Sequence, residues 1–241
     1  MKTLAVCSGG LDSVTLAYTL KSQGKLAAVL SFDYGQRHKK ELQFSQDCAN
    51  NLAVPYFHLP LPGLAALLPG SALTDEKNVE VPHGHYAAKN MNITIVPNRN
   101  AIFLSLAFGL AAAHGFNSVA AAFHGGDHFI YPDCRPEFVD AFSQMQQKSL
   151  DGFEAISLDT PFLNLSKADI VSQGAMHNVP FNETWSCYEG KNLHCGQCGT
   201  CVERQEAFSE AKVLDPTEYA NAQFWKMAVR EHKEGLKDRD R

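Results

Sequence analysis

The sequence predicts an α/β fold in which helices cover both faces of a parallel sheet, followed by a small C-terminal region built around four cysteines. Two patterns support this fold class. Short apolar runs alternate with longer stretches of helical period, and a glycine pair separates the first run from the first helix. The chain has 241 residues, of which 45% are hydrophobic, so it can fill one α/β domain with a small appendage.

Five apolar runs rich in small and β-branched residues are the expected strands: Leu4–Cys7, Leu26–Phe32, Pro55–Leu59, Ser118–Phe123 and Ala155–Asp159. Helical patterns lie near residues 13–23, 38–51, 99–114, 135–149 and 167–176. Ser166 and Asp169 form a capping-box pattern at the start of the last of these helices. We place the α/β domain at residues 1–180 and the metal-binding and C-terminal helical region at residues 181–241.

Two further segments have a less regular pattern. Residues 61–97 contain prolines and glycines without a clear period, which predicts a long excursion over the carboxyl edge of the sheet, a candidate lid. Asp215-Pro216-Thr217-Glu218 is a helix-start pattern, and apolar residues follow it. We expect a C-terminal helix there, with its apolar stripe against the core or at a dimer interface.

The stretch Ser8-Gly9-Gly10-Leu11-Asp12-Ser13 predicts a phosphate-binding loop between the first strand and the first helix. Adjacent glycines let successive N–H groups point into one concavity, and the helix N-terminus adds the positive end of its dipole. The stretch resembles the PP-loop, S-G-G-x-D-S, of the ATP pyrophosphatase superfamily. That resemblance implies a Rossmann-like sheet and ATP bound by residues 8–15, which are Ser8, Gly9, Gly10, Leu11, Asp12, Ser13, Val14 and Thr15.

In that superfamily the loop holds the β,γ-pyrophosphate, and ATP is cut between its α and β phosphates. AMP then remains on a substrate oxygen, so adenylation is the expected chemistry. Asp12 suits this reaction because pyrophosphate brings Mg²⁺, a hard cation that binds one or two carboxylates together with phosphate oxygens. Ser8 and Ser13 can donate hydroxyl hydrogens to phosphate oxygens. The alternative is a plain strand–turn–helix in which the glycines only make the bend.

Charge and hydropathy exclude some classes of partner. The formal net charge is −5 and no long run of Lys and Arg occurs, which argues against a protein that grips nucleic acid through its phosphates. The longest nearly apolar run, residues 101–113, is too short to span a bilayer, and no signal-peptide pattern follows Met1. We therefore expect a cytoplasmic protein with no membrane partner.

Four of the seven cysteines have metal-ligand spacing. Cys187, Cys195, Cys198 and Cys201 form a C-x7-C-x2-C-x2-C set. Four closely spaced thiolates suit one tetrahedral Zn²⁺ per chain, and a closed site of four cysteines is structural. An iron–sulfur cluster is the alternative, although the C-x3-C-P continuation of the ferredoxin motif is missing. Cys48 fits a buried position on a helix.

Four longer motifs carry a resemblance that spans nearly the whole chain. They are Phe32-Asp33-Tyr34-Gly35-Gln36-Arg37-His38, Val96-Pro97-Asn98-Arg99-Asn100, Tyr131-Pro132-Asp133-Cys134-Arg135-Pro136-Glu137-Phe138 and Glu183-Thr184-Trp185-Ser186-Cys187-Tyr188. In this order they resemble the 7-cyano-7-deazaguanine synthases of the queuosine pathway, the QueC family. The resemblance implies a homodimeric enzyme that uses ATP and ammonia to turn 7-carboxy-7-deazaguanine into the nitrile, with zinc bound by the cysteines.

The sequence departs from the family pattern at two places. Many members have glycine where Asn98 stands, but asparagine tolerates positive φ and also caps helices. Many also have a Ser-Gly pair where this chain has Phe129-Ile130, a position expected beside the base pocket.

The remaining candidate site residues are charged or polar and follow predicted strands or start predicted helices. Lys167 and Arg99 are the expected cations that neutralise phosphate charge, and the alternative for Lys167 is a solvated lysine at a helix start. The candidates for binding the substrate are Gln36, Arg37, Asp127, Asp133 and Arg135. Asp127 could instead bind Mg²⁺. Cys134 fits a packing thiol better than a nucleophile, because adenylation already activates the carboxylate.

Three functions compete at this point. The first is the carboxyl-to-nitrile enzyme. The second is a specialised relative that joins the activated 7-deazaguanine carboxylate to another amine, such as one on a protein, or that thiolates tRNA. The third is a zinc-ribbon binding module on an inactive nucleotide-binding scaffold. The intact Asp12 and Ser13 argue against the third function, and the net negative charge of the chain argues against a tRNA substrate.

Overall fold

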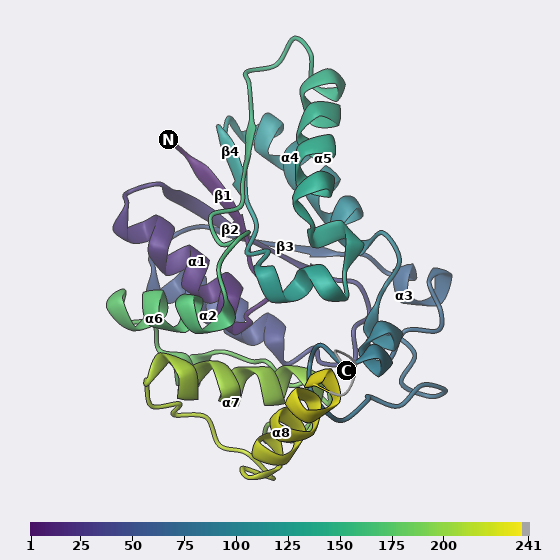
Figure 1. The fold of residues 1–241 in the computed structure, drawn as a ribbon. Helices are drawn as coiled ribbons and strands as arrows, with labels where there is room; N and C mark the ends of the chain where they lie inside the picture. The colour runs from purple at the N-terminus through teal and green to yellow at the C-terminus, as the bar shows by residue number, and fades with distance from the viewer. Residues whose placement is uncertain (238–241) are drawn as a thin grey trace.

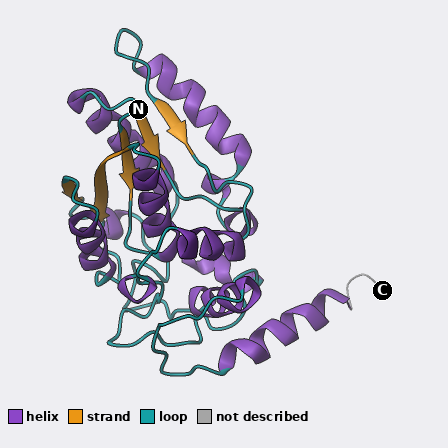
Figure 2. Cartoon of the chain, turned by 90° about the vertical axis from the view of Figure 1, so that its left-hand side faces the viewer, coloured by secondary structure: helices purple, strands orange, loops and turns teal. Residues whose placement is uncertain are grey.

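A parallel five-stranded sheet forms the centre of the computed structural model, which describes residues 1–237. Its strand order is β3-β2-β1-β4-β5 (Figures 1 and 2). The strands are β1 (Thr3–Val6), β2 (Leu26–Asp33), β3 (Tyr56–Pro60), β4 (Ser118–Ala120) and β5 (Ser157–Asp159). All five expected strands are present, and the Rossmann-like fold class is confirmed. The fourth strand ends at Ala120 rather than Phe123, because the chain turns away there toward a short 3-10 helix, η2 (Gly125–Phe129).

Helices cover both faces of the sheet. Successive side chains of a strand point to opposite faces, and the apolar ones on each face pack against helices. Leu4 packs toward one face with side chains of α4 (Arg99–His114) and α5 (Pro136–Ser149). Ala5, the next residue, packs toward the other face against α1 (Leu11–Ser22) and α6 (Lys167–Met176). The helix α2 (Glu41–Asn51) covers that second face beside α1. No helix within residues 1–237 is long and apolar enough to cross a membrane.

The sheet topology creates a crevice at the carboxyl end of β1. This strand lies between β2 and β4, so the chain leaves it toward one side of the sheet and later returns on the other side. Loops that follow the two inner strands diverge at such a switch point, where open α/β sheets bind ligands. The predicted phosphate loop lies in that position.

The segment 61–97, expected as an excursion over the carboxyl edge of the sheet, packs against the main core and forms a wall there. It contains α3 (Leu64–Leu67) and the 3-10 helix η1 (Lys89–Thr94). Its side chains Leu73, Tyr86 and Met91 are buried in the main core. The backbone N–H of Gly84 donates to the carbonyl of Gln197 at 3.0 Å, which joins this wall to the cysteine region.

The C-terminal region contains two helices, α7 (Gly199–Ala211) and α8 (Phe224–Lys237). The sequence analysis did not predict α7, and it placed the start of the last helix too early, near Asp215. The Asp215 carboxylate does not cap a helix: it accepts hydrogen bonds from Arg204 and from the Tyr219 hydroxyl, the latter at 2.6 Å. The helix α8 extends away from the body (Figure 2). Two further 3-10 helices lie earlier in the chain: η3 (Pro132–Cys134) before α5, and η4 (Phe181–Glu183) before α7.

Arg204 anchors this region to the rest of the molecule. Its side chain is 0% exposed and lies 3.2 Å from Asp215 Oδ1. It also donates to Thr184 Oγ1 at 2.7 Å and to the carbonyl of Phe181 at 2.9 Å. Removal of the guanidinium would take a donor away from each of these acceptors.

Arg204→Met is therefore expected to lower the free energy of unfolding by about 3–5 kcal/mol, because the Asp215 carboxylate is left buried without its cation. Urea denaturation at constant free zinc measures this loss. The matched control is Arg230→Met on the exposed side of α8, expected to change the free energy of unfolding by less than about 0.5 kcal/mol. Equal stability of the two variants would contradict the anchoring role.

Candidate active site

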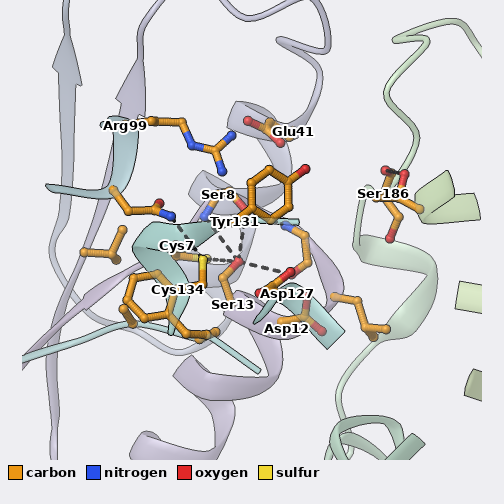
Figure 3. A pocket seen from close by; sticks show the side chains of 18 of the residues that line it. Cys7, Ser8, Asp12, Ser13, Glu41, Arg99, Asp127, Tyr131, Cys134 and Ser186 are labelled. Carbon is orange, nitrogen blue, oxygen red and sulfur yellow. Dashed lines mark hydrogen bonds between the residues drawn. The ribbon is translucent and has the colours of Figure 1, made fainter. Parts of the chain in front are cut away.

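A cavity of about 240 Å³ opens at the carboxyl ends of β1, β2 and β4 (Figure 3). One part of its lining is polar and comes from the phosphate loop and its surroundings: Ser8, Gly10, Asp12, Ser13, Asp127 and Lys167. Another part is aromatic: Phe32, Tyr34, Tyr86, Phe103, Tyr131 and Tyr188. A single cavity thus combines the predicted phosphate loop with an aromatic surface.

The phosphate loop is held open by its own hydroxyls and by a glycine. Ser13 Oγ donates to the carbonyl of Gly10 at 3.1 Å and accepts from the backbone N–H of Ser8 at 3.2 Å (Figure 3). Gly9 has φ +88°, and a Cβ there would lie 2.1 Å from the carbonyl oxygen of Glu41. Only glycine fits between the loop and α2.

Lys167 lies in this polar part, between two carboxylates. Its Nζ is 2.7 Å from Asp12 Oδ2 and 3.1 Å from Glu203 Oε2. Burial disfavours the charged ammonium, but the two carboxylates outweigh burial and raise the pKa of Lys167 above its ordinary value. Burial likewise opposes ionisation of Asp12, and Lys167 outweighs it and lowers the pKa of Asp12. Both groups are therefore charged at neutral pH.

The local sequence explains how Lys167 reaches this position. The predicted capping box is confirmed: Ser166 Oγ accepts from the N–H of Asp169 at 3.2 Å, and Asp169 Oδ2 accepts from the N–H of Ser166 at 2.9 Å. This box starts α6 at Lys167, whose side chain crosses to Asp12 on α1.

His124 is a buried donor next to this cluster. Its Nδ1 accepts from the backbone N–H of Gly126 at 3.1 Å, so the neutral ring carries its proton on Nε2. That nitrogen lies 3.5 Å from Asp127 Oδ1 and 3.3 Å from Lys167 Nζ. The arrangement orients Asp127, which also accepts from the Tyr86 hydroxyl at 2.9 Å.

Asp12 fits a divalent cation. Its Oδ1 is buried and finds no hydrogen-bond partner among residues 1–237, whereas its Oδ2 binds Lys167. A carboxylate oxygen without a partner, beside a loop suited to phosphates, matches the oxygen ligands that Mg²⁺ prefers.

The aromatic part is built around Arg99 and stacked rings. Phe32 and Phe103 stack with centroids 4.3 Å apart, and the Arg99 guanidinium lies 5.7 Å from the Tyr131 ring centre. Arg99 begins α4 after Asn98, which has φ 60° and ψ 16°. Asparagine thus adopts the left-handed conformation that the sequence analysis expected it to tolerate.

Cys134 lies in the same part of the cavity as a neutral thiol. Burial raises the pKa of this thiol well above its ordinary value. Asn100 Nδ2 lies 3.2 Å from its sulfur. A thiol held in this form is a poor nucleophile, which agrees with a packing role.

Several residues that the sequence analysis selected lie outside the lining of the cavity. Val14 and Thr15 are buried within the first turns of α1. Gln36 is 1% exposed and its amide is used within the protein, donating to Glu41 and to the carbonyl of Phe32. Arg37 donates to the carbonyl of Val79 at 2.7 Å.

Asp133, Arg135 and the Phe129-Ile130 pair also lie outside the lining. Asp133 Oδ2 accepts from the backbone N–H of Asn100 at 2.9 Å and so helps to cap α4. Arg135 is exposed, and its Nε donates to the carbonyl of His128 at 2.9 Å. Phe129 is 76% exposed, while Ile130 packs into the main core. A role of Asp133 or Arg135 in substrate binding stays a prediction.

Conversely, the sequence analysis did not select several residues that contact the site. Glu41, Tyr86 and Phe103 line the cavity, and Glu203 pairs with Lys167. Glu41 follows one of the quoted motifs by three residues, which was a usable signal. Glu203 lies on α7, the helix that was not predicted, so its position could not be inferred.

The four cysteines form a separate buried cluster. Their sulfur atoms all lie within 4.8 Å of one another, and those of Cys195 and Cys201 are 3.9 Å apart. Four sulfurs bound to one Zn²⁺ at 2.3 Å would lie about 3.8 Å apart. Backbone N–H groups of Gln197 and Cys198 donate to the Cys195 sulfur, which favours the thiolate. The cluster is a metal site by geometry and donor chemistry.

Comparison with protein families identifies this combination of cavity and cysteines. The family described as "Queuosine biosynthesis protein QueC" matches residues 2–212. The chain belongs to the QueC family. Among curated relatives, the 7-cyano-7-deazaguanine synthase of Rhizobium etli is 58% identical over 232 residues, covering 96% of this chain and 98% of the relative.

A second relative of this QueC protein, the 7-cyano-7-deazaguanine synthase of Paracoccus denitrificans, is 58% identical over 231 residues, covering 96% of the chain and 98% of the relative. Among solved structures, the NMN synthetase from Francisella tularensis superposes with a TM-score of 0.47 at 14% identity, covering 88% of this chain and 78% of that chain. That likeness is too distant to indicate an activity.

Proposed function

We propose that this QueC protein is a 7-cyano-7-deazaguanine synthase that uses ATP and ammonia to convert 7-carboxy-7-deazaguanine into the nitrile, releasing AMP and pyrophosphate. The observation that carries the proposal is the shared cavity: the phosphate loop with its Asp12–Lys167 pair and the aromatic residues with Arg99 line one space. The names of relatives that are 58% identical supply the substrate class.

The chemistry follows from the poor leaving ability of hydroxide. Attack of the substrate carboxylate on the α-phosphorus of ATP gives an acyl adenylate and pyrophosphate. Ammonia then displaces AMP and forms the amide, losing a proton. Attack of the amide oxygen on the α-phosphorus of a second ATP releases a second pyrophosphate and activates that oxygen. Loss of AMP with the two amide protons then leaves the nitrile. The same loop serves both rounds.

The polar residues at and around the phosphate loop have parts in these steps. Backbone N–H groups of the loop, with Ser8 and Ser13, hold the β,γ-phosphates, as expected for a nest at a helix N-terminus. Lys167 and Arg99 neutralise charge that develops on the transferred phosphates. Asp12 would hold Mg²⁺, which supplies further charge neutralisation at the phosphates. Asp127, oriented by His124 and Tyr86, faces the same space.

The cysteine cluster has a structural part in this proposal. Zn²⁺ is the proposed ion, one per chain, because four thiolates complete a tetrahedral shell and leave no position for substrate. A homodimer is a further expectation from the family resemblance, and a cytoplasmic location is one from the hydropathy of the sequence.

The test is product analysis. Incubation with ATP, ammonium and 7-carboxy-7-deazaguanine is expected to yield the nitrile by mass, with AMP as the only adenine nucleotide product. Stoichiometric ADP would falsify the assignment of the loop. An unchanged carboxylate, or a mass increase on a protein amine in place of the nitrile, would exclude the proposed reaction.

A further inference from the structure

Glu41 is a carboxylate of the cavity that the proposed reaction does not yet use. It lies in the first turn of α2, and its side chain is only 11% exposed. Glu41 lines the cavity together with Tyr34, Arg99 and Tyr188. Figure 3 shows it beyond the phosphate loop, near Arg99 and Tyr131 in this view. A buried carboxylate needs partners, so its hydrogen bonds determine what it can still accept.

The side chains of Gln36 and His38 each face one oxygen of Glu41. Gln36 Nε2 donates to Oε1 at 3.2 Å, and His38 Nε2 lies 3.3 Å from Oε2. Gln36 is itself fixed, because its Oε1 accepts from the N–H of Tyr34 at 2.9 Å. A carboxylate has about four lone-pair sites, so each oxygen keeps acceptor capacity for a ligand. The carboxylate is thus held in place and only partly satisfied.

We propose that Glu41 binds the N1–H and 2-amino group of the 7-deazaguanine ring, and so selects a guanine-type base. This inference rests on the proposed function and names the residue that recognises its substrate. The two donors of this edge lie side by side and match the two oxygens of one carboxylate. The stacked rings of Phe32 and Phe103 and the nearby tyrosines provide apolar surface for the flat base.

The same geometry rejects other bases. The corresponding edge of adenine has no N–H donor: its N1 is an acceptor that would point a lone pair at the carboxylate, and its position 2 carries only a C–H. Other carboxylates of the cavity are less suited. Asp12 binds Lys167, and Asp127 accepts from Tyr86 and lies next to His124. Glu41 is paired with the Gln36 amide and the His38 ring, which hold it without a lysine or arginine.

The experiment compares 7-carboxy-7-deazaguanine with the analogue that lacks the 2-amino group, using the full-length protein. Wild-type kcat/KM is expected to fall by about 10- to 100-fold for the analogue, since one hydrogen bond to a charged group is lost. In Glu41→Gln, kcat/KM for 7-carboxy-7-deazaguanine is expected to fall by a similar factor, because the NH2 of the new amide faces an N–H donor of the base. The two bases should then differ by less than about threefold, and the KM for ATP should stay unchanged.

Glu137→Gln is the matched control, because Glu137 is an exposed glutamate in the first turn of α5 and its removal affects the helix dipole in the same way. Wild-type protein that binds both bases equally by calorimetry would overturn the role of Glu41, whether or not the variant folds. So would Glu41→Gln protein that keeps the wild-type preference. Absence of nitrile formation from 7-carboxy-7-deazaguanine by wild-type protein would instead overturn the proposed function.

Discussion

Asp12→Asn is expected to reduce ATP-dependent turnover on the order of 1000-fold while the protein stays folded. The amide keeps an oxygen for Lys167, so the 2.7 Å contact between α1 and α6 can persist. It loses the negative charge that a divalent cation requires at Oδ1, the atom that has no partner within residues 1–237. AMP release at several Mg²⁺ concentrations measures the effect.

Asp140→Asn, an exposed change on α5, is the control for loss of one carboxylate and should keep wild-type turnover. Thermal unfolding of both variants checks that the fold is retained. An Asp12→Asn protein that turns over at the wild-type rate would exclude Asp12 as the cation ligand.

Cys198→Ser is expected to have the largest effect on stability. Structural zinc supplies on the order of 10 kcal/mol in isolated zinc-binding peptides, and the loops around this cluster have little apolar core of their own. Cys198 is also the N-cap of α7, so loss of the metal releases the start of that helix. We expect weakly soluble or thermally unstable protein that lacks about one zinc per chain.

Cys48→Ser is the control, because Cys48 is a buried cysteine outside the cluster. It measures how much stability is lost when a buried thiol becomes a hydroxyl without loss of metal. It should keep its zinc by elemental analysis. Iron and sulfide in anaerobically purified wild-type protein would contradict zinc, and a metal-free but fully stable Cys198→Ser protein would contradict the structural role.

Local motifs could be predicted from the sequence because their geometry depends on neighbouring residues. The glycine at position 9, the Ser166–Asp169 capping box and the left-handed Asn98 all depend on local backbone conformation, and the structure has them as expected. The parallel arrangement of the strands follows equally from the alternation of apolar runs and helices.

The positions of polar side chains could not be predicted in the same way, because their partners come from distant parts of the chain. The Asp133 carboxylate, for example, accepts from the backbone N–H of Asn100, a contact that the sequence did not indicate. The helix α7 has a polar sequence and contains the buried Arg204, whose partners are known only once the chain has folded. Glu203, which lies on this helix and pairs with Lys167, was missed for this reason.

The contact between Lys167 and Asp12 joins residues 155 positions apart, and the backbone N–H of Trp185 donates to the carbonyl of Gly9 at 2.9 Å. The phosphate loop is therefore translated well before the groups that complete its surroundings. A nascent chain cannot form both of these contacts until residues up to Trp185 have left the ribosome.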